Sequence, residues 1–351
     1  METISKTHLT NLSPDELEAW FLALGERPFH ARQTFKWIHA RQAESFADMT
    51  DLRLVLREKL PDAATITTLR INHVTKTEDG ATRKYLLELF DGKTVEAVLI
   101  CHEDRRTVCV SCQVGCALGC TFCATAQMGF QRDLTAGEIV EQVYTVMRDS
   151  GERVTNVVFM GMGEPMLNYD AVITAADLLN IPHGLGIGAR HITISTAGHV
   201  PGLRRFTKEG HPYRLAVSLN APDDTSRTDI MPITRKWSIA ELLDAVKTYI
   251  VTANKRMTFE YVLIGDVTDS PDKARALVQL LKGIHCAVNL IPYNPADDRL
   301  ARPTPEAVDR FYRVLAHGQR AVTVRWSQGT DIQAACGQLA TQKQDNKRVV
   351  Q

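Results

Sequence analysis

Apolar residues recur every three or four positions near the start of the chain, which indicates helices. The first helix would begin at Pro14, where Ser13 and Glu16 can form a capping box, and it would end at Gly25. Apolar positions at helical spacing continue through residues 30–60. The sequence therefore predicts a small helical segment at the N-terminus.

The pattern changes to strands after residue 66. Residues 85–90 and 94–100 are rich in strand-forming side chains, and they flank Asp91-Gly92, a pair that is typical of hairpin turns. An antiparallel hairpin is therefore predicted here.

From residue 107 onward, short apolar strands alternate with segments that are long enough to hold a helix. One of these segments opens with a capping box at Thr135 and Glu138. The predicted strands span residues 107–111, 156–160, 191–195, 214–219, 258–264 and 287–291. Repeated βα units favour a parallel sheet, here curled into a partial (β/α)6 barrel, and such sheets bind ligands at the C-terminal ends of their strands.

These patterns describe an α/β protein with four segments. The segments are a helical one over residues 1–62, strands packing on the barrel over 63–106, the barrel over 107–303 and a C-terminal extension over 304–351. Within the extension, apolar positions predict a helix near 308–315 and a strand at 322–326, and the polar tail 342–351 is expected to fray.

The 351 residues carry 41 Lys plus Arg and 41 Asp plus Glu, so net charge exerts no overall attraction on nucleic acid. Any such contact must come from a local surface, and the basic side chains of residues 27–59 fit either a solvated helical face or an RNA-contacting face. The first residues form no apolar leader, and no apolar run is long enough to span a bilayer. We therefore expect a cytoplasmic protein without a membrane partner.

Cysteines are concentrated in one stretch, since six of the eight fall between Cys101 and Cys123. In a cytoplasmic protein such clustering indicates metal or thiol chemistry rather than a disulfide framework. Cys116, Cys120 and Cys123 follow the first barrel strand with the spacing C-x3-C-x2-C.

Three thiolates at this spacing suit a [4Fe–4S] cluster, whose fourth iron is then left without a protein ligand. That iron can bind the amino and carboxylate groups of S-adenosylmethionine, and an electron from the cluster can then break the sulfonium C–S bond. Gly115 and Gly119 would let the loop wrap closely around the cluster. The alternative is a structural zinc site with Cys112 as its fourth ligand.

Small or polar residues follow the later barrel strands, at the edge of the sheet where ligands bind. Gly163 and Glu164 could hold the amino group of the methionyl moiety, and Asn294 could bond the adenine. The residues that could bond the ribose hydroxyls or the carboxylate are Ser195, Ser218, Leu219 and Asn220. Each position alone is a weak indication of a ligand site. The prediction of such a site rests on their recurrence after several strands, together with the cysteine loop.

Several sequence segments together resemble the RlmN/Cfr family of radical S-adenosylmethionine RNA methyltransferases, and most of all its RlmN members. The segments are CVSCQVGCALGCTFCATAQMGF, GMGEPMLNYD, ITISTAG, SLNAPDDTSR, NLIPYNP and DIQAACGQL. The resemblance begins at GERPFHARQTFKWI and runs to about Leu339. It implies methylation of C2 of an adenosine in the peptidyl-transferase centre of 23S rRNA, and in some species of a tRNA adenosine beside the anticodon. Cfr members act on C8 of the ribosomal adenosine instead, which confers antibiotic resistance.

The resemblance also implies roles for residues outside the cysteine loop. Cys336 would accept a methyl group from one S-adenosylmethionine, and a second one would supply a 5′-deoxyadenosyl radical, so two are used per turnover. The carbon radical formed on the methylated sulfur would add to the base, and Cys109 would resolve the crosslink through a disulfide. Glu96 matches a glutamate that is proposed as the proton acceptor.

The chain departs from the family pattern at three places. Cys112 stands where serine is usual, and Asn220 stands where histidine is frequent. Arg325-Trp326 differs from a more basic run before the methyl-accepting cysteine. Because that run is expected to meet RNA, substrate choice is the property that these departures affect most.

The sequence leaves three functions open. The first is C2 methylation of 23S rRNA, with tRNA as a second partner; the second is C8 methylation of the same rRNA adenosine. The third is a zinc-stabilised RNA-binding protein without catalysis. For the enzyme we expect an electron donor such as flavodoxin and a monomeric state.

Overall fold

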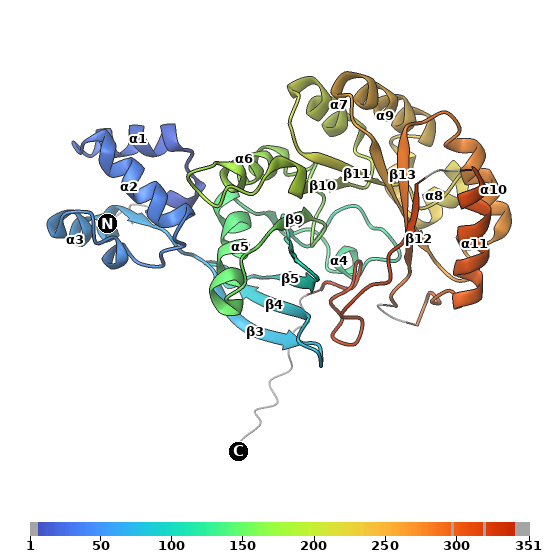
Figure 1. The fold of residues 1–351 in the computed structure, drawn as a ribbon, viewed down its shortest axis with the longest axis horizontal. Helices are drawn as coiled ribbons and strands as arrows, with labels where there is room; N and C mark the ends of the chain where they lie inside the picture. The colour runs from blue at the N-terminus through green and yellow to red at the C-terminus, as the bar shows by residue number, and fades with distance from the viewer. Residues whose placement is uncertain (1–5, 296–297, 319–320, 341–351) are drawn as a thin grey trace, which may run out of the picture.

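The computed structural model describes residues 6–295, 298–318 and 321–340 (Figure 1). The tail 342–351, which was expected to fray, lies outside the described residues. Hydrophobic side chains from the N-terminal segment, the sheet and the C-terminal extension share one continuous buried core.

Six parallel strands form the centre of the sheet and lie in the order in which they occur in the chain. They are β6 (Arg105–Cys109), β9 (Asn156–Phe159), β10 (Ile192–Thr196), β11 (Arg214–Ser218), β12 (Met257–Leu263) and β13 (Cys286–Pro292). Each strand pairs in parallel with the next one. The predicted partial barrel is confirmed, and each strand begins and ends within two residues of its predicted bounds.

Helices connect the parallel strands along the outside of the sheet (Figure 1). They are α5 (Ala136–Ser150), α6 (Tyr169–Asn180), α7 (Val200–Glu209), α8 (Asp224–Ile230), α9 (Ile239–Ala253), α10 (Pro271–Leu280) and α11 (Pro305–Gly318). Thr135 and Glu138 form the predicted capping box of α5, in which each side chain accepts from the other residue's backbone N–H. Among the described residues, none of the helices is both long and apolar enough to cross a membrane.

The sheet continues beyond the barrel on both sides. β3 (Arg70–Lys76), β4 (Thr82–Glu88) and β5 (Thr94–His102) add antiparallel strands next to β6, so this segment extends the barrel sheet edge to edge. Asp91-Gly92 forms the turn between β4 and β5, as predicted, with Gly92 at a positive φ of 77°. On the other side, β14 (Val322–Val324) pairs in parallel with β13.

The N-terminal segment folds into helices that lie beside the barrel (Figure 1). These are α1 (Pro14–Ala23), α2 (Pro28–His39) and α3 (Leu54–Ala63). Ser13 and Glu16 cap α1 as predicted. A two-stranded parallel ribbon of β1 (Thr7–His8) and β2 (Ala64–Thr65) brings the beginning and the end of this segment together.

Buried polar contacts fasten the N-terminal segment, and the chain that immediately follows it, to helix α5 of the barrel. The Glu141 carboxylate accepts the backbone N–H groups of Thr68 and Leu69 at 2.7 and 3.0 Å and pairs with His8. One turn along the helix, the Tyr144 hydroxyl lies 2.7 Å from His39 Nδ1. Burial, with smaller contributions from other histidines, lowers the pKa of His39 to about 3, so this contact is made by a neutral imidazole.

We expect Glu141→Gln to lower the free energy of unfolding by about 2 kcal/mol, because a buried carboxylate that accepts several hydrogen bonds is replaced by a neutral amide with one acceptor oxygen. Chemical denaturation measures this change. Glu44→Gln is the matched control, since Glu44 pairs with Arg148 of the same helix at 3.2 Å but is exposed. The control should change the free energy by less than about 0.5 kcal/mol. Equal losses in the two variants would contradict the assignment of the junction to Glu141.

Candidate active site

A single cavity lies at the C-terminal ends of the parallel strands. It encloses about 1020 Å³ of space between protein atoms, with the solvent at its mouth included. The predicted site residues that line it are Cys116, Cys120, Cys123, Gly163, Glu164, Ser195, Ser218, Asn220, Asn294 and Cys336. Residues up to 220 positions apart in the chain thus meet around one cavity at this edge of the sheet, as expected for this topology.

The cysteine loop is closed at its base by a two-stranded antiparallel ribbon. β7 (Gln113–Val114) and β8 (Arg132–Asp133) form this ribbon, and the Cys116 N–H donates to the Gly129 carbonyl oxygen at 3.2 Å. Gly115 has a φ of +76°, and a Cβ atom there would overlap the same carbonyl oxygen. Only glycine fits this position, because the backbone at Gly115 lies directly against that of Gly129. The close wrapping of the loop that was predicted for Gly115 is therefore observed. The short helix α4 (Ala124–Gln127) follows the third cysteine.

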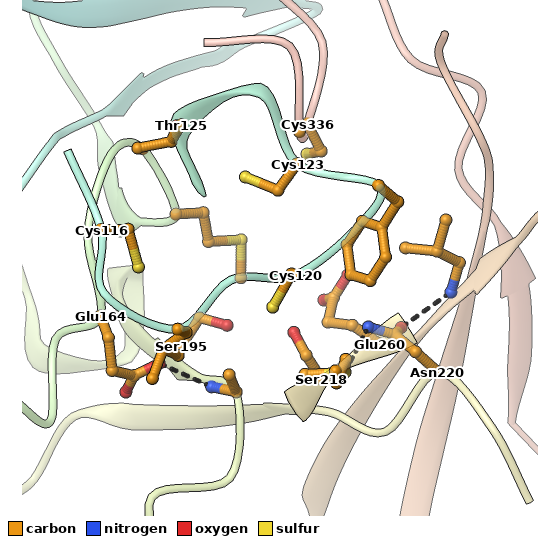
Figure 2. A pocket seen from close by; sticks show the side chains of 18 of the residues that line it. Cys116, Cys120, Cys123, Thr125, Glu164, Ser195, Ser218, Asn220, Glu260 and Cys336 are labelled. Atoms are coloured by element: carbon orange, nitrogen blue, oxygen red, sulfur yellow. Dashed lines mark hydrogen bonds between the residues drawn. The ribbon is translucent and has the colours of Figure 1, made fainter. Parts of the chain in front are cut away.

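The three cysteines of the loop surround one space (Figure 2). A small apolar cluster, which includes Ile230 and Met231, packs against the loop at Leu118, Cys120 and Phe122. The Thr121 N–H donates to the Ile230 carbonyl oxygen at 3.0 Å, which ties the loop to the end of helix α8. Burial raises the pKa of the Cys116 thiol to about 11, so a bound cation has to provide the free energy that ionises it.

The donor set fits a [4Fe–4S] cluster with S-adenosylmethionine better than it fits a structural zinc ion. Cys112, the fourth ligand that the zinc alternative requires, is 2% exposed and packs in the hydrophobic core, and it is not a lining residue. Within the part of the chain that the structure describes, no three Cys, His, Asp or Glu side chains are grouped closely enough for a single ion. The three thiols nevertheless line one cavity, and in a cluster each thiolate binds a different iron.

Asn294 carries a second observation that fits a nucleoside ligand. Its Nδ2 donates to Ser327 Oγ at 2.8 Å, while its Oδ1 is buried and has no hydrogen-bond partner within the described structure. An unpaired buried acceptor is costly, and the exocyclic amino group of adenine is a suitable donor for it. Asn294 therefore has a free acceptor of the kind that the predicted adenine contact needs, and the contact itself stays a prediction.

Glu164 holds two strand ends together beside the cavity. Its carboxylate accepts the Ala197 N–H at 2.8 Å and the Met166 N–H at 3.0 Å, and its own N–H donates to Gln113 Oε1 at 2.8 Å. Burial raises the pKa of Glu164, and the backbone and side-chain hydrogen bonds oppose that rise. The carboxylate thus lies preorganised at the cavity wall, where the ammonium group of a bound amino acid can reach it (Figure 2).

The residues at the C-terminal end of β11 divide between the cavity and the core. Ser218 and Asn220 line the cavity, but Leu219 is buried in the core and does not. Asn220 adopts a φ of +61°, which asparagine tolerates better than most residues, and its Oδ1 accepts the Val262 N–H at 2.9 Å. Its Nδ2 lies 3.2 Å from Met231 Sδ, so the amide is held in place across two neighbouring strands.

Two charged residues of the site, Glu260 and Arg227, were not predicted from the sequence. Glu260 on β12 lines the cavity, accepts from Asn289 Nδ2 at 3.1 Å and lies 3.9 Å from Arg325. Burial raises the pKa of Glu260, and Arg325 counteracts this. Arg227 is fully buried behind the cavity. The available signals were a carboxylate inside a largely apolar strand and an arginine inside a recognised motif.

Arg227 binds the ends of β10 and β11 through a planar guanidinium group. Its Nη2 donates to the carbonyl oxygens of Ala197 and Ser218 at 2.6 and 3.0 Å, and its Nε donates to the Leu219 carbonyl oxygen at 2.9 Å. Its Nη1 donates to Thr234 Oγ1 at 2.8 Å. Burial lowers the pKa of Arg227 to about 10, so the group keeps its charge at neutral pH.

The remaining predicted residues lie on the side of the cavity near the C-terminal extension. Cys336 is exposed and lines the cavity beside Cys123 (Figure 2). Cys109 is buried at the end of β6, and burial, together with the nearby Cys336 thiol, raises its pKa to about 12. Both are free thiols in the structure. Glu96 is buried on β5, outside the cavity lining, and it accepts the Ala340 N–H at 3.0 Å.

Comparisons with known proteins show which family the chain resembles. The sequence model of the ribosomal RNA large subunit methyltransferase N-terminal domain matches residues 7–66, and that of the radical SAM superfamily matches residues 110–281. The dual-specificity RNA methyltransferase RlmN of Geobacter sulfurreducens is 48% identical over 332 residues, which cover 94% of this chain and 91% of that protein. The protein of the same name from Anaeromyxobacter dehalogenans is 46% identical and covers 95% of this chain and 92% of its own.

A solved structure matches over nearly the whole chain. The crystal structure of a radical SAM methyltransferase from Sphaerobacter thermophilus superposes with a TM-score of 0.92 at 44% sequence identity. The match covers 95% of this chain and 99% of that one. The N-terminal helices and the barrel therefore share their arrangement with that protein.

Substitutions in the cysteine loop test whether its close turn is needed for metal binding. Gly115→Ala should lower the iron and sulfide content about threefold or more, because its Cβ would force the loop away from Gly129 and separate the ligands. Iron and acid-labile sulfide analysis of the anaerobically reconstituted protein measures this effect.

Gly119→Ala is the matched control for Gly115→Ala. Gly119 has a similar φ of +70°, but the nearest atom to its Cβ would be Pro232 Cγ at 3.8 Å. This variant should carry only backbone strain of about 1–2 kcal/mol and should retain about four irons per chain. Normal iron content in Gly115→Ala would show that the close approach is not required.

Proposed function

This chain belongs to the RlmN family of radical SAM RNA methyltransferases, and we propose that it methylates C2 of a specific adenosine in the peptidyl-transferase centre of 23S rRNA. We propose a tRNA adenosine beside the anticodon as its second substrate, which agrees with the dual specificity in the names of its relatives. Those names favour C2 over the C8 alternative.

One observation carries the proposal: Cys336 lines the same cavity as the three cysteines of the loop. Adenine C2 is an electron-poor carbon that does not attack a methyl donor as an ordinary nucleophile does. A thiol that can carry a one-carbon unit next to a site for radical chemistry solves this problem. The arrangement of Cys336 beside Cys123 supports this reaction class.

The cofactor assignment follows from the lining residues. Cys116, Cys120 and Cys123 would hold the [4Fe–4S] cluster, and Glu164 and Asn294 would bind the two ends of S-adenosylmethionine. Bound there, the cluster and S-adenosylmethionine would supply a methyl group and one-electron chemistry. We propose that two S-adenosylmethionine molecules are used per turnover, since the methyl donor and the radical source are consumed separately.

The protein's own residues would act in sequence. The Cys336 sulfur carries the one-carbon unit to the base as a carbon radical. After the C–C bond forms, one electron would leave to the one-electron chemistry that the cluster supplies, and Glu96 accepts the proton that leaves C2. The Cys109 sulfur then attacks the Cys336 sulfur, so that an S–S bond forms while the bond from Cys336 to the transferred carbon breaks. The electron pair of that bond, with a proton, completes the new methyl group, and external thiols reduce the disulfide.

The RNA has to deliver one base into the cavity, because the reacting atom of a stacked adenosine is out of reach. Trp326 is 52% exposed and stands next to Arg325, which reaches Glu260 of the cavity wall. An exposed aromatic side chain beside an arginine is well suited to stack on an RNA base. We propose that this pair meets the RNA at the cavity mouth, and that the N-terminal helices provide a further contact surface.

The experiment that tests the function is nucleoside mass spectrometry after reaction of the cluster-loaded protein with unmodified 23S rRNA fragments and with tRNA. We expect 2-methyladenosine in both RNAs, at a single adenosine in each. The finding of 8-methyladenosine would replace the C2 assignment, and unmodified RNA together with intact S-adenosylmethionine would rule out the proposed reaction.

Cys109→Ala should trap a covalent protein–RNA adduct, because no thiol remains to break the bond between Cys336 and the transferred carbon. Denaturing electrophoresis with and without ribonuclease detects the adduct. Cys101→Ala is the control, because it removes a half-buried cysteine from neighbouring strand β5 and should leave methylation unchanged. The Cys109→Ala, Cys336→Ala double variant should form no adduct. Recovery of only free, unmodified protein from the Cys109 variant would count against this role of Cys109.

A further inference from the structure

The segment around Cys336 has little regular secondary structure, yet it is fastened to the rest of the protein at several points. The Ala124 N–H donates to the Gly337 carbonyl oxygen at 2.8 Å, and Thr125 Oγ1 donates to the Leu339 carbonyl oxygen at 2.6 Å. Both contacts attach the segment to α4, immediately after the cysteine loop. A loop whose position matters for chemistry needs such fixed points, because its own backbone does not define it.

The two outermost attachments of this segment are made by one ion pair. Lys84 Nζ donates to the Gln333 carbonyl oxygen at 3.3 Å and lies 3.2 Å from Glu96 Oε1. The other carboxylate oxygen, Oε2, accepts the Ala340 N–H at 3.0 Å. Cys336 lies between Gln333 and Ala340, so the pair holds the chain on both sides of the thiol.

The pair stands on two neighbouring strands. Glu96 of β5 is directly opposite Leu86 of β4, and Lys84 is two residues from Leu86, so all three side chains share one face of the sheet. The side chain of Lys84 is 15% exposed and that of Glu96 is 6% exposed. A pair this deeply buried is held in one geometry, unlike an exposed ion pair.

We propose that Lys84 is a positioning residue for Cys336: with Glu96 it forms a clamp that holds residues 333–340 so that the thiol faces the cavity. The inference rests on the proposed role of Cys336 as methyl carrier. The clamp requires the carboxylate to be charged, since Lys84 and the Ala340 N–H both bind its oxygens. Removal of the lysine leaves a buried carboxylate without its cation, which favours the neutral form.

Because of the clamp, the position of residues 333–340 depends on whether Glu96 carries the proton that it is proposed to accept. A neutral Glu96 binds Lys84 and the Ala340 N–H less strongly than a carboxylate does. Arrival of the proton therefore loosens residues 333–340 at the stage when the Cys336 sulfur must meet Cys109. Glu96→Gln, a neutral side chain of the same shape, reproduces this loosened state.

The test measures how fast iodoacetamide alkylates Cys336 in the iron-loaded protein, by mass spectrometry of its peptide. Lys84→Met should raise this rate about tenfold, the fold-change expected from loss of one hydrogen bond to a charged group. Lys84→Arg keeps the charge and should stay within about twofold of the unchanged protein. Glu96→Gln should raise the alkylation rate of Cys336 to a similar extent. The double variant Lys84→Met, Glu96→Gln should react at about the same rate as either single variant, since the two residues act as one unit.

Two controls separate positioning from general destabilisation. Arg83→Met removes a cation from the neighbouring position on β4, where Arg83 lies 4.0 Å from Asp149, and it should leave Cys336 unchanged. Cys286, buried on β13, is an internal reference, and its alkylation should not change in any variant. Lys84→Gln provides a second substitution in case the methionine variant folds poorly.

An unchanged Cys336 rate in Lys84→Met and Lys84→Gln would overturn the proposal. A rise in Cys286 alkylation equal to that of Cys336 would overturn it too, because the effect would then be global. With RNA present, Lys84→Met should lower the methylation rate about tenfold and leave the RNA dissociation constant unchanged. If the unaltered protein methylates no RNA, the proposed function fails, while the alkylation comparison still decides whether the clamp exists.

Discussion

The parallel alignment of six barrel strands is the constraint on which the site depends. Because all six end at the same edge, the loops after them converge on one cavity, although they come from distant parts of the sequence. Where the parallel strands end, the ladder no longer provides hydrogen-bond donors for the backbone carbonyl groups. Arg227 provides donors for three of them on two adjacent strands, and its planar guanidinium keeps the cavity wall in one shape.

Three buried carboxylates in or near the cavity wall each have defined partners. Glu164 receives two backbone N–H groups, Glu260 has Asn289 and Arg325, and Glu96 has Lys84 and a backbone N–H. Each carboxylate thereby joins elements that are separate in the chain. Polar groups that could bind a ligand are thus also the groups that hold the wall together, so the site is preorganised by the interactions that maintain the fold.

The thiol chemistry is divided between a local element and a remote one. The three cysteines of the loop lie within eight residues, and a single ribbon with one close glycine turn brings them around a common space. Cys336 arrives from the far end of the chain, on a segment that depends on hydrogen bonds to α4 and to the clamp of Lys84 and Glu96. In the proposed reaction, the position of Cys336 would therefore depend on contacts that a proton can weaken, whereas the three cysteines of the loop are positioned by their own local turn.

Local patterns in the sequence were enough to determine the barrel strands, the capping boxes of α1 and α5, the hairpin turn at Asp91-Gly92 and the cysteine loop. Their physical causes act over a few residues: side-chain periodicity, capping hydrogen bonds, positive φ angles and ligand spacing. The tertiary structure alone decided that Cys112 packs in the core and that Leu219 faces away from the cavity. It also decided that Glu260 and Arg227 belong to the site, and that Glu96 binds a backbone group 244 positions away. These outcomes depend on burial and on partners that only the folded chain brings within hydrogen-bond distance. The local sequence marks Glu260 and Arg227 as unusual, but it does not encode their partners.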